Sequence, residues 1–316
     1  YLEKFIPLTE VTSFMVKITM IVVFTVINLL GIREVSQVST VLSIAVLAGF
    51  TVVTIVGFAN WNYSPVEPFM PPEQGLVESL GGSICIAIWM YCGYETMANV
   101  AGELEDPQVI PKGLRLAMPI IALSYFLPTM AGIVSVGQWE NWATEGEEAV
   151  GYMDVLITYA GPVFGVMFLI VAILSQCSIF NAYIASGSRG FFVMADDHLF
   201  PQFMVRLSKK RKVPAVSIIT MAFFTILLCR WDFTTLVMAT TPLMLYLYIA
   251  LAVATRRLRK IYPVEERKAK GLFVIPGGNL GLNFMTAMPI VVSLIALYVN
   301  GTEYFISGFL MLLISL

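Results

Sequence analysis

Long runs of apolar residues constrain this chain more than any other feature of its sequence. A bilayer core about 30 Å thick takes about 20 helical residues to cross. Eight runs meet or approach that length and a ninth reaches the last residue, at 13–30, 41–58, 80–101, 114–136, 161–185, 213–229, 233–254, 284–299 and 304–316. The sequence therefore predicts an all-α polytopic membrane protein with about nine transmembrane helices, in one transmembrane domain over residues 1–316.

Composition supports a membrane protein and excludes several other classes. Hydrophobic residues make up 58% of the chain and charged residues 13%, whereas soluble domains average about 45–50% and about 25%. The net charge of −2 gives no basic excess for phosphate, so we expect no nucleic-acid partner. His198 and the four scattered cysteines lack metal-ligand spacing. We therefore expect no metal site, no resident cofactor and no catalytic residue.

Basic residues divide the loops into two sets, which predicts the orientation in the membrane. Sixteen of the nineteen lysines and arginines fall in alternate loops, at Arg33, Lys112, Arg115, Arg189, Arg206, Lys209, Lys210, Arg211, Lys212, Arg256, Arg257, Arg259, Lys260, Arg267, Lys268 and Lys270. Because basic loops stay in the cytoplasm, the first run is expected to cross inward. An odd number of helices would then precede Tyr1, so we expect a piece of a longer protein of the cell (plasma or inner) membrane.

The third run, residues 80–101, carries features that conflict with an unbroken helix. Gly93 lies near its middle and Glu95 follows two residues later. The aromatic residues beside them are Trp89, Tyr91 and Tyr94. Glycine costs about 1 kcal/mol in a helix interior, and a carboxylate at the bilayer centre costs about 2.5–3.5 kcal/mol. Transporters place such groups where a helix unwinds and meets a solute, so we predict a binding site here.

Two plainer interpretations compete with this site. Glycine in a membrane helix often marks close helix packing, and Lys17 in the first run offers Glu95 an ion-pair partner. Asn99 is better explained by an interhelical hydrogen bond. The Thr240-Thr241-Pro242 stretch interrupts the seventh run, and an ordinary proline kink explains it better than a hinge.

The fifth run is polar at its centre, where it contains Ser175, Ser178 and Asn181. Hydroxyl and amide oxygens can coordinate Na⁺ or bind a substrate. They can equally join helices, at about 0.6 kcal/mol for each hydrogen bond. From the residues alone we favour the helix-joining role.

Four segments together resemble amino acid permeases of the amino acid/polyamine/organocation (APC) superfamily. Residues 89–113, W-M-Y-C-G-Y-E-T-M-A-N-V-A-G-E-L-E-D-P-Q-V-I-P-K-G, resemble the sixth helix of that family and the loop after it. Residues 28–38 resemble the link between its fourth and fifth helices. Residues 188–201 resemble the loop after its eighth helix, and residues 271–278 the loop before its eleventh. The segments follow the family order, so the chain is identified as a member that lacks the first three helices.

The resemblance implies a partial LeuT-like inverted-repeat fold, in which the runs correspond to the family's fourth to twelfth helices. Members bind substrate between the broken first and sixth helices. The resemblance implies that Trp89, Cys92, Gly93, Tyr94 and Glu95 bind the substrate. We add Tyr91, which belongs to the same aromatic cluster. Tyr183 matches a cavity-facing aromatic position of the eighth helix. The first-helix glycine motif, which holds the substrate carboxylate, has no counterpart here.

Ion coupling stays open at this point. Many relatives carry a fifth-helix lysine that replaces a sodium ion, and Ser43 stands at the matching position. Na⁺ coupling, H⁺ coupling through Glu95 and exchange all remain alternatives. With Glu95, the residues that we expect to take part are Ser43, Ser175, Ser178 and Asn181.

The leading interpretation is a secondary-active amino acid transporter, a symporter or exchanger that works by alternating access. Its partners would be a small-molecule substrate and the lipid bilayer, and the sequence gives no oligomeric state. A polyamine or organic cation transporter is the first alternative, because Glu95 would pair with an ammonium group. A non-transporting membrane fragment or accessory subunit is the second.

Overall fold

The computed structural model describes residues 9–70, 75–106, 108–137, 151–231 and 233–299, together with 306, 309 and 310. The aromatic and acidic segment 139–148 and most of the ninth apolar run therefore lie outside the described residues. Every regular element of the described residues is a helix. The chain divides into unit 1, Tyr1–Glu67, Thr96–Glu105 and Gly113–Arg230, and unit 2, Pro68–Glu95, Asp106–Lys112 and Trp231–Leu316.

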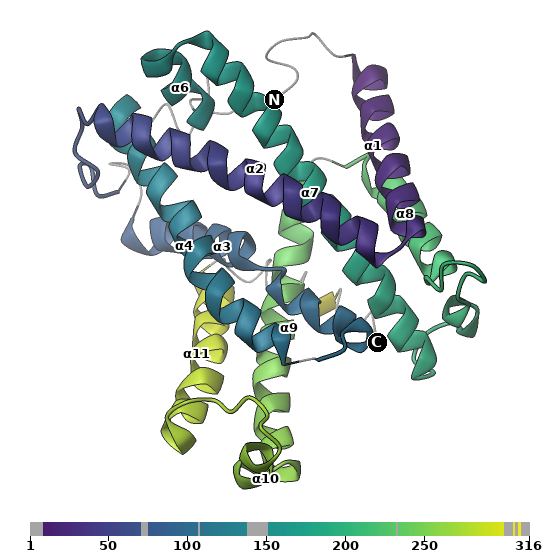
Figure 1. Cartoon of the computed structure of the whole chain (residues 1–316). Coiled ribbons are helices and arrows are strands. Elements are labelled where there is room, and N and C mark those ends of the chain that lie inside the picture. The colour runs from purple at the N-terminus through teal and green to yellow at the C-terminus, as the bar shows by residue number, and fades with distance from the viewer. Residues whose placement is uncertain are drawn as a thin grey trace. The chain divides into compact units, whose positions relative to one another are not determined.

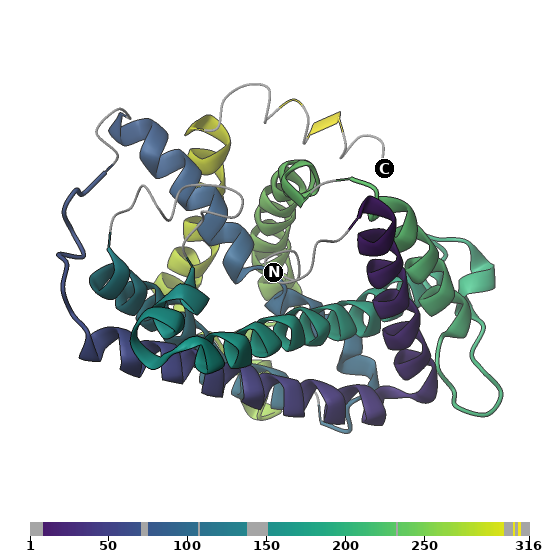
Figure 2. The same ribbon diagram turned by 90° about the horizontal axis from the view of Figure 1, so that it is seen from above.

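Unit 1 is built from long apolar helices. They are α1 (Glu10–Leu30), α2 (Ile32–Ala59), most of α4 (Val109–Val136), α6 (Tyr152–Ala160), α7 (Pro162–Asp196) and α8 (Ala215–Leu228), with the short η3 (Gln202–Val205). Figure 2 shows α2 and α7 side by side, and α1 next to α8. α1 and α2 meet at Gly31, whose φ of 137° suits glycine far better than any other residue.

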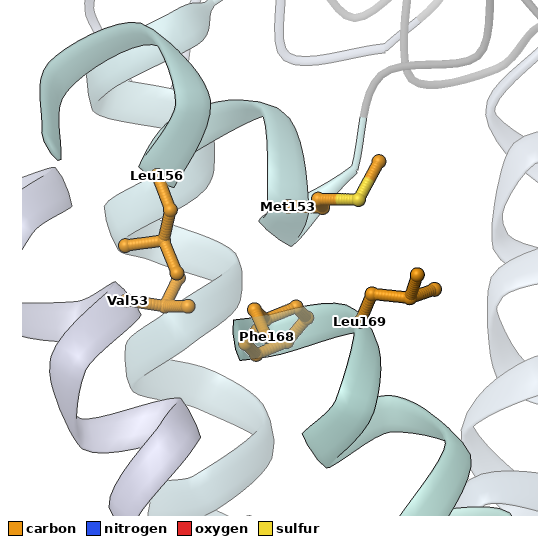
Figure 3. Close-up of a cluster of buried hydrophobic side chains, with 5 residues drawn as sticks. All are labelled: Val53, Met153, Leu156, Phe168 and Leu169. Atoms are coloured by element: carbon orange, nitrogen blue, oxygen red, sulfur yellow. The ribbon is translucent and has the colours of Figure 1, made fainter. Parts of the chain in front are cut away.

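One core of unit 1 lies where α2, α6 and α7 meet. Its buried side chains are Val53, Met153, Leu156, Phe168 and Leu169 (Figure 3). The ring of Phe50 packs edge-on against Tyr152 at 5.7 Å and against Phe168 at 5.9 Å between centroids. Such aromatic pairs add about 0.5–1.5 kcal/mol beyond their buried area. The short α6 is thereby fixed against the two longest helices of the unit.

Unit 2 contains α3 (Leu76–Tyr91), α9 (Phe233–Ile261), α10 (Val264–Ala269) and α11 (Gly278–Val299). Figure 1 shows α9 and α11 side by side. Leu245, Ala296 and Leu297 are buried between these two helices, and Ile84 and Ile88 of α3 pack against them. α3 is therefore held by the α9–α11 pair up to its last turn.

Five described helices are long and apolar enough to cross a membrane: α1, α2, α4, α7 and α11. Large apolar side chains are exposed along them, such as Leu116 and Val163, each at 70%. In water such exposure would be costly, whereas lipid accepts it. Two further expected spans are shorter than a bilayer crossing needs: α8 has 14 residues and α3 has 16. α9 is long enough but carries basic residues in its last turn.

Several expected boundaries are wrong. α2 begins at Ile32 and not at residue 41, so Arg33 lies within a helix. α7 continues past Ala185 to Asp196, so Arg189 lies within a helix and not in a loop. Its side chain is 4% exposed and donates to Ala185 O at 2.8 Å. Because this hydrogen bond lies within α7, the polar residues there can stay helical. α9 runs through Pro242 without an interruption and extends to Ile261. α4 begins at Val109, five residues before the expected start.

Candidate functional site

The third apolar run is interrupted in the middle. α3 ends at Tyr91, and Cys92 is extended, with φ −75° and ψ 160°. Gly93 has φ 110°, a backbone geometry that costs other residues about 1–2 kcal/mol. The chain resumes as the 3-10 helix η2, Tyr94–Glu103. The predicted interruption is confirmed and lies at Cys92 and Gly93.

Glu95 replaces hydrogen bonds that the interrupted helix loses. Its carboxylate accepts the Gly93 N–H, at 2.9 Å to Oε2 and 3.1 Å to Oε1. On the α3 side, the Cys92 N–H donates to Trp89 O at 3.3 Å, and the Cys92 thiol donates to the same oxygen at 2.9 Å. A carboxylate offers about four acceptor positions, so Glu95 keeps capacity for a cationic group while it caps the break.

Aromatic side chains flank the break along the chain. Trp89 is 38% and Tyr94 40% exposed, and Tyr91 is half-buried. An ammonium group over an aromatic face gains about 0.5–2 kcal/mol. All six residues predicted from Trp89 to Glu95 belong to unit 2. A half-buried acid and three rings within seven residues give this segment the chemistry to hold a protonated amine.

The other predicted residues belong to unit 1. Asn181 of α7 is fully buried and joins three helices. Its Oδ1 accepts from Asn28 Nδ2 of α1 at 2.9 Å, and its Nδ2 donates to Val35 O at 3.2 Å and to Ser39 Oγ at 3.0 Å in α2. Asn181 thus has the helix-joining role that the plainer interpretation of the fifth run assigns to it.

Four further predicted residues lie along α2 and α7. Ser43 is exposed on α2, and Ser175, Ser178 and Tyr183 are half-buried on α7. Their roles toward a substrate or ion stay predictions. Among the described residues, no group of three or more His, Cys, Asp or Glu side chains is placed to hold a metal ion.

Asn99 packs against α7, which agrees with an interhelical contact. A Cβ atom on Gly190 would come within 3.2 Å of Asn99 Nδ2, so a larger residue at this position would require the Asn99 side chain to shift. Sequence reasoning does not single out Asn28 or Ser39, which complete the network of Asn181. An asparagine within an apolar run needs a buried partner, and that signal could have identified Asn28.

Comparison with known proteins now adds to this geometry. The family model described as amino acid permease matches residues 2–314. The chain belongs to the amino acid permease family. This is a family of transporters and not of enzymes. With its apolar helices, membership makes the chain a multi-pass membrane protein.

Curated relatives of the chain are named as transporters of polyamines and of amino acids. A polyamine transporter of Arabidopsis thaliana is 26% identical over 300 residues, which cover 92% of this chain and 58% of the relative. The branched-chain amino acid permease of Lactococcus lactis is 23% identical, over 80% of this chain and 55% of its own. A vacuolar cationic amino acid transporter of A. thaliana is 24% identical, over 77% and 40%. The chain spans less than two thirds of the length of these relatives.

Proposed function

We propose that the permease moves amino acids across the cell membrane by alternating access, as a symporter or exchanger, and that it binds them at Gly93. The observation that carries this proposal is the interrupted helix, because irregular backbone at membrane depth is tolerated only where protein or a water-filled cavity satisfies it. We assign α3 and η2 to the broken sixth helix of the family.

The two sides of the break offer opposite partial charges. α3 ends at Tyr91, and the carbonyl end of a helix attracts cations. η2 begins at Tyr94, and the first N–H groups of a helix attract anions. An amino acid carries an ammonium and a carboxylate on one carbon atom, so it can meet both ends at once. The ring of Trp89, near the end of α3, adds to the ammonium side, and the carboxylate of Glu95 at the break offers the ammonium a counter-charge.

Uptake by a Gly93→Leu variant tests this proposal. In proteoliposomes that hold the full-length gene product, the variant should lose at least nine tenths of labelled amino acid uptake, since leucine disfavours φ 110°. Gly113→Leu is the matched control, because no atom lies within 4 Å of a Cβ atom at Gly113. Unchanged uptake by the Gly93 variant would contradict substrate binding at Gly93.

A polyamine is the second candidate substrate. The acid at the break favours it, as do the relatives named as polyamine transporters. Glu95→Gln removes the charge while its amide oxygen can still accept the Gly93 N–H. If polyamines are the substrate, this variant loses putrescine binding and keeps any neutral amino acid binding. If both are retained, the carboxylate has no role in recognition.

Coupling to Na⁺ or H⁺ belongs to the same proposal. Replacement of Na⁺ by choline should slow uptake if serine oxygens of α2 and α7 hold the ion. An imposed pH gradient should drive uptake if Glu95 carries the proton. A rate that responds to neither, but requires substrate on the opposite side of the membrane, identifies an exchanger.

A further inference from the structure

A cavity of about 290 Å³ lies at the end of α9 that carries its basic residues, within unit 2. Its lining residues are Thr255, Leu258, Arg259, Tyr262 and Arg267. The first four follow the spacing i, i+3, i+4 and i+7, so they share one face of the helix and the turn after it. Arg267 comes from α10, which folds back at the end of α9 (Figure 1).

The cavity presents two half-buried guanidinium groups, and none of the residues that line it is an acid. Arg267 Nε and Nη2 donate to Phe273 O at 3.3 Å and 3.0 Å. These bonds hold the guanidinium in place, and its remaining N–H groups are available to a ligand. Arg259 has no hydrogen bond or ion pair with any described residue. Burial, together with the charge of Arg267, lowers the pKa of Arg259. Such a pair of cations favours an anion that would bridge them.

The acids nearby do not neutralise this charge. From residue 256 to 270 there are seven basic side chains, Arg256, Arg257, Arg259, Lys260, Arg267, Lys268 and Lys270, and two acidic ones, Glu265 and Glu266. Lys270 Nζ already binds Glu266 Oε1 at 2.7 Å. This hydrogen bond lowers the pKa of Glu266, so Glu266 is ionised and paired at neutral pH. The excess of positive charge therefore stays at the cavity.

The position of the cavity selects among anions. Basic loops face the cytoplasm, where anionic lipids attract basic groups with about 1 kcal/mol for each one. Leu258 lines the cavity, and Ile261 and Tyr262 beside it are 64% and 51% exposed. Apolar and tyrosine side chains next to cationic ones match the boundary between headgroups and acyl chains. A soluble anion would gain nothing from the apolar rim.

We propose that the cavity formed by Thr255, Leu258, Arg259, Tyr262 and Arg267 binds the phosphate headgroup of an anionic phospholipid of the cytoplasmic leaflet. The guanidinium groups bind the phosphate oxygens, bidentately where geometry allows. The Thr255 and Tyr262 hydroxyls supply further donors, and the acyl chains follow the apolar rim. This site is separate from Gly93 and does not depend on the transport proposal.

Lipid binding to the purified protein tests this proposal without any transport measurement. Phosphatidic acid and phosphatidylcholine of equal chain length are compared by native mass spectrometry and by thermal unfolding in detergent. We expect Arg259→Gln to weaken phosphatidic acid binding about tenfold, as the loss of a charged hydrogen bond implies. Arg257→Gln removes the same charge at an exposed position outside the cavity, and should change binding less than twofold.

Three results would overturn the proposal. The first is an equal loss in the Arg257 and Arg259 variants, which means unspecific attraction to a basic surface. The second is equal binding of phosphatidylcholine. The third is inorganic phosphate that binds as tightly as phosphatidic acid, which assigns the cavity to a soluble anion. Arg259→Lys guards against a folding defect, because it keeps the charge and should bind with intermediate affinity.

Discussion

Gly93 and Glu95 act as a pair. Gly93 permits the backbone turn, and its N–H is accepted by the acid two residues later. Both features are local in sequence, which is why the interruption could be predicted from the sequence alone. The Asn28–Asn181 hydrogen bond joins residues 153 positions apart. Its existence depends on helix packing that no local pattern encodes.

Asn181→Ala should lower the free energy of unfolding by about 1–2 kcal/mol, because it breaks several interhelical hydrogen bonds. Thermal unfolding in detergent, followed by circular dichroism, measures the change. Ser178→Ala is the control on the same helix, three residues away and without a hydrogen bond to any described residue, and should change stability by less than about 0.5 kcal/mol. Equal effects would contradict a structural role for the network.

Close approach between two backbones decides how α2 and α4 pack. A Cβ atom on Gly57 of α2 would lie 2.6 Å from the Ala131 backbone oxygen of α4. Backbone atoms cannot move aside as a flexible side chain can, so only glycine fits. The sequence shows this glycine within an apolar run, yet its contact with α4 is a tertiary fact.

Gly57→Ala should therefore cost about 1–3 kcal/mol of unfolding free energy through overpacking. Gly113→Ala, in the open first turns of α4, should be neutral or stabilise by up to about 1 kcal/mol, since alanine is the better helix former. The two variants are compared by thermal unfolding. A Gly57 variant as stable as the Gly113 variant would show that α2 and α4 do not pack this closely.

Helix ends were harder to predict than helix positions. Apolar runs located the helices because lipid selects for them. α7 and α9 extend beyond their runs into polar residues. Within α7, Ser188 and Arg189 donate to Ala185 O in the same helix. Hydropathy marks only where polar residues begin, whereas a helix continues as long as its polar groups find partners.

Orientation in the membrane is a property of the whole molecule. The basic loop between η3 and α8 contacts the turn between α1 and α2. Arg211 Nη1 lies 3.5 Å from Glu34 Oε1 and donates to Leu30 O at 3.1 Å. This contact places two basic loops on the same side of unit 1, as the charge pattern predicts.

Cysteine labelling tests that orientation. In a background without native cysteines, Lys210→Cys should react with an impermeant maleimide only after the membrane is permeabilised. Ser64→Cys, at the opposite end of α2 from Gly31, should react in intact cells. Both positions are exposed. The reverse pattern would invert the predicted topology.

Protection of Cys92 by substrate tests the binding site most directly. Cys92 is the native thiol at the break and is half-buried, so a bound solute at Gly93 would cover it. The rate of alkylation is followed by mass spectrometry in the purified protein, with Cys229 of unit 1 as the internal control. We predict that a saturating transported amino acid slows alkylation of Cys92 at least fivefold and leaves Cys229 unchanged. An unaltered Cys92 rate, with a substrate that the same protein transports, would contradict binding at the break.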